Sequence, residues 1–202
     1  MRHDHSKAIL EYWNRLRGMR AAPDRRDIEP SDIRSILGDT FILEVNEAFR
    51  SVSFRLAGTR LCNAYGRELK GLGFLALWEE ADNFAVYSAV KKVYADFQPC
   101  TLSCIAQSEG RRFVEYEIML LPLFNPETST KRILGTASPI TREAWVGTDK
   151  LLNNRVRSIR YPDVDAMEQA PSMVTPVSQA DNVSENKGKS FGHLTVIDGG
   201  RQ

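Results

Sequence analysis

The fold is decided by residues 82–120, which read DNFAVYSAVKKVYADFQPCTLSCIAQSEGRRFVEYEIML. Apolar side chains recur every three or four positions from Val86 to Phe97, so this part predicts an amphipathic helix that ends before Pro99. From Leu102 onward the apolar period changes to two, and Glu109-Gly110 interrupts the alternation with a tight turn. A helix that runs into an antiparallel hairpin is typical of an α+β domain.

The same two periods organise the rest of the chain. Three- and four-residue spacing predicts an amphipathic helix at 6–19 and short helices at 31–37 and 59–65. Alternation predicts strands at 41–46, 52–56, 102–105, 113–120 and 133–137. We therefore expect a five-stranded antiparallel sheet, with short helices and one long helix over one face and an amphipathic helix before it.

Composition excludes several classes of protein. The 202 residues carry a formal net charge of +1, which provides no field for nucleic acid or an acidic membrane. No apolar run is long enough to span a bilayer, and the first residues, MRHDHS, lack the apolar core of a secretory signal. Together these features predict a cytoplasmic protein, in which Cys62, Cys100 and Cys104 are reduced, buried thiols.

Three motifs resemble a bacterial family of single PAS domains that was long catalogued as a domain of unknown function. The first is Tyr12-Trp13-x-x-Leu16-Arg17-Gly18 with the following Pro23-x-Arg25 and Asp27-Ile28-Glu29-Pro30. The others are Phe54-Arg55-Leu56-Ala57-Gly58-Thr59-Arg60-Leu61 and Tyr65-Gly66-Arg67-Glu68-Leu69-Lys70-Gly71. The resemblance implies the PAS fold, and it implies a cytoplasmic sensory or regulatory module without an output domain on the same chain.

Within that resemblance the chain divides into four segments. Residues 1–38 are an N-terminal helical extension and residues 39–142 are the PAS core. Residues 143–192 are a largely disordered linker, because their Ser, Asn, Gln and Pro content cannot bury enough apolar area to offset the entropy of ordering. Residues 193–202 are a short apolar C-terminal segment, whose LTVIDGGR also resembles a recurring ending of the family.

Catalysis and common cofactors are disfavoured by the polar residues. His3, His5 and His193 all fall in segments expected to be mobile, so neither a histidine base nor a metal site is predicted. The long helix has no histidine for the haem ligation usual in haem-binding PAS proteins, and no cysteinyl-flavin motif surrounds Cys62. Glu115 and Glu117 are assigned to the exposed outer face of the sheet. The sequence therefore predicts a protein that is not an enzyme and predicts no cofactor, with His-ligated haem and cysteinyl flavin disfavoured and haem ligation by Cys or Met left open.

The space between sheet and helices holds the candidate ligand-binding residues. These are the apolar and tyrosyl side chains expected to point inward, namely Leu61, Tyr65, Phe74, Trp78, Val90, Tyr94, Cys104, Ile118 and Leu120. The many bulky aromatic rings favour a core filled by side chains. The alternative is an apolar pocket for a small metabolite, with tyrosine hydroxyls and Trp78 as its polar contacts.

The leading hypothesis is a cytoplasmic PAS module that acts through protein–protein contacts and forms a homodimer. The aromatic stripe of the first helix needs to be buried, so it is the candidate interface. Its members are Ile9, Tyr12, Trp13 and Leu16. The alternative hypothesis is a sensor that binds an apolar metabolite in the PAS cavity.

Overall fold

The computed structural model describes residues 1–124 and 130–164. Its central element is one antiparallel sheet in the order β2-β1-β5-β4-β3-β6. The strands are β1 (Thr40–Asn46), β2 (Ser51–Ala57), β3 (Cys100–Ser108), β4 (Phe113–Leu123), β5 (Lys131–Pro139) and β6 (Leu151–Arg160). The predicted α+β class and antiparallel sheet are confirmed, with six strands in the described part of the chain in place of five.

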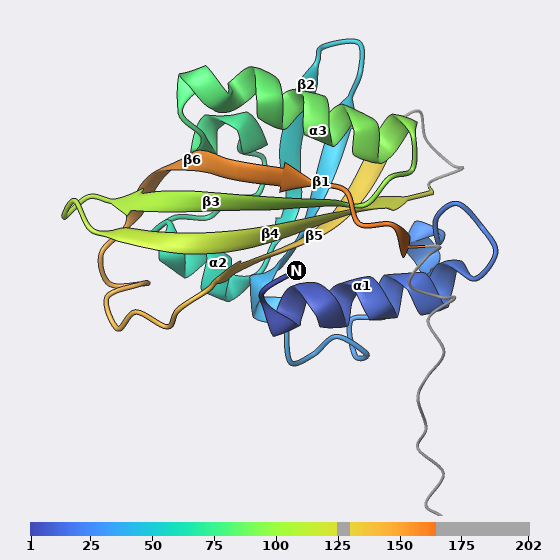
Figure 1. The fold of residues 1–202 in the computed structure, drawn as a ribbon, viewed down its shortest axis with the longest axis horizontal. Coiled ribbons are helices and arrows are strands. Elements are labelled where there is room, and N and C mark those ends of the chain that lie inside the picture. Colours follow the sequence, from blue (N-terminus) through green and yellow to red (C-terminus); the bar gives the residue numbers. More distant parts are fainter. Residues whose placement is uncertain (125–129, 165–202) are drawn as a thin grey trace, which may run out of the picture. The chain divides into compact units, whose positions relative to one another are not determined.

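Among the described residues, three α-helices and four short 3₁₀ helices accompany the sheet. The α-helices are α1 (Asp4–Arg17), α2 (Thr59–Ala64) and α3 (Asn83–Ala95). The 3₁₀ helices are Arg25–Asp27, Leu37–Asp39, Phe74–Leu77 and Glu80–Asp82. Helices α1 and α3 lie on opposite sides of the sheet, so each face has its own cover (Figure 1).

The inner face of the sheet carries the main hydrophobic core. Alternate residues of β3 and β4, such as Leu102 and Ile118, pack against α2, α3 and the 3₁₀ helix Phe74–Leu77. The side chains of Val86, Val90 and Val93 are fully buried because they form the stripe of α3 that faces the sheet. This is the layer that the helical period of residues 82–97 predicted.

The outer face of the sheet carries a second core beneath α1. Ile9, Tyr12 and Trp13 are 0–5% exposed and pack on outward side chains of the sheet, among them Met119 and Leu121. Leu16 packs against the same cluster. The argument that this stripe needs a second chain for its burial is therefore wrong, because the chain's own sheet buries it.

Strand β6 lies inside the segment predicted to be a disordered linker, which corrects that prediction for residues 151–160. The strand is polar because it is an edge strand, and two bulges against β3 interrupt its alternation. Its inward residue Asn154 is 2% exposed, so the usual apolar signal is missing where the strand meets the core. The rest of the predicted linker from residue 165 and the C-terminal segment 193–202 lie outside the described residues.

Candidate functional site

All nine predicted cavity residues lie in the inner core. They come from α2, its following residue, the segment 74–78, α3, β3 and β4, and every one of them is less than 8% exposed. The side chains that the sequence predicted to share one interior space do lie in one cluster in the structure. Their burial is equally compatible with a packed core and with a closed ligand site, so their role stays a prediction.

An aromatic cluster fills one end of this inner core. The rings of Phe41 and Phe54 meet edge to face with centroids 5.5 Å apart, and Phe54 meets Phe74 in the same way at 5.6 Å. Phe74 also stacks on Phe41 at 6.1 Å and contacts the edge of Trp78 at 5.8 Å. Such spacings are those of directly packed rings. Phe41 and Phe54 were predicted only as buried strand residues, although they complete the cluster.

A small polar network lies beside this cluster, at Tyr65, Leu77 and Asn154. The hydroxyl of Tyr65 lies 3.0 Å from Oδ1 and 2.7 Å from Nδ2 of Asn154, and that amide nitrogen donates to the carbonyl of Leu77 at 2.9 Å. Burial raises the pKa of Tyr65, so the phenol stays protonated. The indole Nε1 of Trp78 is buried and has no hydrogen-bond partner among the described residues. Asn154 was missed because β6 itself was missed.

The motif at residues 54–60 has a structural role. The guanidinium of Arg60 donates two hydrogen bonds to the carboxylate of Asp39, both at 2.8 Å, and thereby joins α2 to the 3₁₀ helix Leu37–Asp39. A Cβ on Gly58 would lie 2.3 Å from the carbonyl oxygen of Gly38. Only glycine fits there, because the obstacle is backbone that cannot move aside. The motif fixes a close junction of two backbones.

The prediction that no histidine belongs to the folded part is wrong at the N-terminus. Nδ1 of His5 lies 2.8 Å from the buried carboxylate of Asp39 and 3.1 Å from the hydroxyl of Ser138. The imidazole of His3 accepts a hydrogen bond from the backbone N–H of His5 and caps α1. Burial lowers the pKa of His3 and the neighbouring His5 lowers it further. Both rings hold α1 in place rather than extend into solvent.

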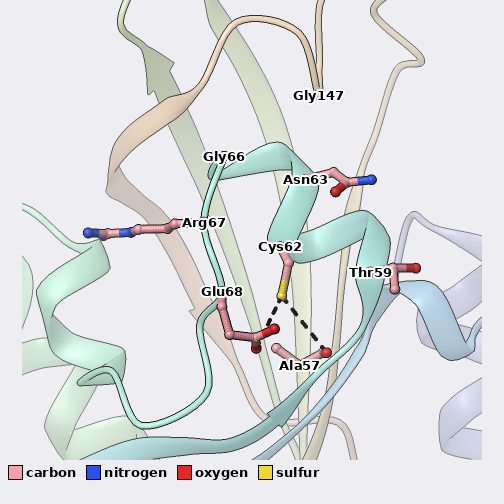
Figure 2. A pocket seen from close by; sticks show the side chains of 8 residues that line it. All are labelled: Ala57, Thr59, Cys62, Asn63, Gly66, Arg67, Glu68 and Gly147. Carbon is pink, nitrogen blue, oxygen red and sulfur yellow. Dashed lines mark hydrogen bonds between the residues drawn. The ribbon is translucent and has the colours of Figure 1, made fainter.

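Cys62 lines a polar pocket of about 500 Å³ beside α2 (Figure 2). Its thiol lies 3.9 Å from the carbonyl of Ala57 and 3.7 Å from the carboxylate of Glu68. Burial raises its pKa, and the charge of Glu68 acts in the same direction. Cys62 is half-buried and not buried as predicted, whereas Cys100 and Cys104 are buried and their burial raises the pKa of each to about 12. The thiols are therefore weak nucleophiles.

A profile of the PAS domain family matches residues 1–138. The chain belongs to the PAS domain family. The predicted resemblance is confirmed, and with it the assignment to a family of sensory modules. Among curated proteins, none matches this PAS domain.

Two solved structures resemble the PAS domain at low identity. A light-oxygen-voltage domain studied with a flavin analogue shares 13% identity over 58% of this chain and 90% of its own, with a TM-score of 0.41. A sensory box histidine kinase/response regulator from Burkholderia thailandensis shares 12% identity over 56% of this chain and 86% of its own, with a TM-score of 0.37. The family assignment rests on the profile match.

The described part of the PAS domain offers neither a membrane helix nor a metal cluster. Within residues 1–124 and 130–164, no helix is both long and apolar enough to cross a bilayer. In the same ranges, no three side chains of the His, Cys, Asp and Glu types gather as metal ligands.

Glu117 is a buried anchor for the N-terminus, and not the exposed residue predicted from its outer-face position. The residue is 3% exposed, and its carboxylate accepts hydrogen bonds from the backbone N–H groups of Arg2 at 2.8 Å and His3 at 2.9 Å. Burial by itself would raise the pKa of Glu117, but these N–H donors, the Ser6 side chain and the positive N-terminus together outweigh it, and the pKa lies below its usual value of 4.5. The neighbouring Glu115 is more exposed and pairs with the guanidinium of Arg2.

Replacing Glu117 with Gln is expected to lower the free energy of unfolding by about 1–2 kcal/mol at pH 7, because the two N–H donors lose a charged acceptor. A carboxylate with a depressed folded pKa stabilises the fold above the unfolded pKa, and this contribution is lost as the pH falls through the folded pKa. The gap between wild type and Glu117→Gln should therefore close between about pH 5 and pH 3 in urea denaturation monitored by circular dichroism. Glu115→Gln is the matched control, with a change below about 1 kcal/mol. A gap that is the same at pH 7 and pH 3 would contradict the anchoring role.

Proposed function

We propose that this PAS domain is a cytoplasmic regulatory module that acts through contact with a protein partner. The observation that carries the proposal is the aromatic cluster of Phe41, Phe54, Phe74 and Trp78, whose rings pack directly on one another where the sheet and helices meet. A module whose interior is filled by its own side chains transmits information through its surface. No catalytic role and no cofactor are proposed.

Two of the exposed aromatic side chains are the proposed points of contact. Phe84 at the start of α3 is 83% exposed and Phe113 at the start of β4 is 62% exposed. Large aromatic residues dominate the binding energy of protein interfaces when they are buried by a partner. Exposed phenylalanines on two different elements therefore support a protein contact.

Affinity purification of the intact chain from its native host is expected to recover one partner at a fixed stoichiometry. Phe84→Ser or Phe113→Ser should lower that recovery by roughly tenfold or more, as expected for the loss of an aromatic hot spot. Met19→Ser is the matched control, since Met19 is 99% exposed and lies outside both elements. Recovery that neither Phe84→Ser nor Phe113→Ser lowers would count against the proposal.

The second candidate function, a sensor for an apolar metabolite, is favoured by one observation. The buried indole Nε1–H of Trp78 has no partner among the described residues and would be satisfied by a ligand acceptor. Native mass spectrometry of freshly purified protein separates the two functions. A retained small molecule whose removal shifts the NMR signal of the Trp78 indole N–H would replace the first proposal with the second.

A homodimer remains part of the proposal, but the α1 stripe is not its interface, since the chain's own sheet buries Ile9, Tyr12 and Trp13. Light scattering of the intact chain measures its mass directly.

A further inference from the structure

An apolar groove of about 510 Å³ opens beside the outer core, between the edge strand β2 and the segment 25–38. Its walls include Ile28, Ile33, Ile42 and Leu134, which belong to the outer core, and Leu56 of β2. This volume lies within the range of small-molecule sites in proteins. The groove lies outside the space between the sheet and α3 and is independent of the proposed function.

Two leucines that line the groove are far more exposed to water than the core side chains beside them. Leu37 is 41% exposed and Leu56 is 48% exposed, although both adjoin buried apolar side chains. A ligand with an apolar part would remove these two side chains from water. The walls therefore select an apolar group.

The rim of the groove is basic. Arg25, Arg34 and Arg60 line it, and no acidic side chain is among its lining residues, all of which are described. Arg60 is committed to Asp39, but the guanidinium groups of Arg25 and Arg34 have no hydrogen-bond or ion-pair partner among the described residues. A free guanidinium presents paired N–H donors that match a carboxylate.

We propose that this groove binds a single-tailed carboxylate amphiphile, with the tail on Leu37 and Leu56 and the carboxylate between Arg25 and Arg34. The charge complementarity decides the class of ligand, because an apolar groove lined by two guanidinium groups that are unpaired among the described residues, and by no carboxylate, favours an anion that carries an apolar tail. The site lies on the surface, so the ligand exchanges freely with solvent.

Isothermal titration with decanoate is expected to give saturable one-to-one binding. Decanol, which has the same tail without the charge, should bind roughly tenfold more weakly or worse, since it forfeits the charge-assisted hydrogen bonds. Arg25→Glu and Arg34→Glu should each weaken decanoate by about tenfold or more. Arg55→Glu is the matched control, because Arg55 is exposed on β2 next to Leu56 but does not line the groove, and it should change the affinity less than about twofold.

Amide NMR shifts on titration should cluster at Leu37, Leu56 and Ala57, which locates the ligand in the groove. Circular dichroism of each variant checks that it is folded, and Arg34→Gln provides a milder change if Arg34→Glu is not. The proposal is overturned if decanoate does not saturate, if decanol binds equally well, or if the groove variants bind like Arg55→Glu. It is also overturned if anionic phosphatidylglycerol vesicles bind while free decanoate does not.

Discussion

Trp13→Ala is expected to lower the free energy of unfolding by about 3–5 kcal/mol, the range for removing a large aromatic side chain from a core. Trp13 is fully buried in the outer core beneath α1. Its indole Nε1 donates a hydrogen bond of 2.7 Å to the carbonyl of Pro122 on β4, so the change leaves a cavity and also removes this buried hydrogen bond. Urea denaturation monitored by far-UV circular dichroism measures the loss.

The matched control for this change is Met19→Ala. Met19 follows α1 and is 99% exposed, so its truncation should alter the free energy of unfolding by less than about 0.5 kcal/mol. The two variants also separate the two interpretations of the aromatic stripe. If Trp13→Ala left stability unchanged but halved the mass of the protein in light scattering, the stripe would be an interface between chains and not part of the fold.

The helical and strand periods predicted most of the architecture because they report which side chains are buried. They do not report what buries them. The stripe of Ile9, Tyr12 and Trp13 was correctly identified as a face that water does not contact, but its cover is the outer face of the chain's own sheet. An antiparallel sheet can have one face in water or both faces covered, and the alternation along β4 distinguishes these cases only weakly. The signal available in the sequence was that Met119 and Leu121 are apolar although they occupy outward positions of β4. In the structure both side chains are fully buried.

The polar anchors of the N-terminus lay beyond sequence reasoning for a different reason. His5, Asp39 and Glu117 are distant in sequence, and nothing local marks them as partners. Charged and histidine residues near a chain end are ordinarily solvated, so the pattern MRHDHS predicted a mobile segment. The structure shows instead that a buried carboxylate on β4 and another before β1 hold this segment through its backbone N–H groups and an imidazole. Fold class was predictable from periodicity, whereas these contacts depend on the register of distant elements.

Phe74→Ala is expected to lower the free energy of unfolding by about 3–5 kcal/mol and to open a cavity in the inner core. Phe74 is 2% exposed and contacts Phe41, Phe54 and Trp78, so no single neighbour can fill the space that its ring leaves. The cavity would be lined by apolar rings and would therefore stay free of water. Phe84→Ala is the matched control, because Phe84 is 83% exposed and its truncation leaves no cavity.

The same variant tests whether the interior of the PAS domain is filled by its own side chains. An apolar cavity of this kind binds benzene, so Phe74→Ala should regain about 1 kcal/mol of stability when benzene is present at about five times its Kd. Wild type should gain nothing, because the packed rings of Phe41, Phe54 and Trp78 leave no room beside Phe74. Denaturation of both proteins with and without benzene measures the difference. A wild-type protein that benzene stabilised as strongly as the variant would possess an open interior, and the metabolite sensor would then be the better account of its function.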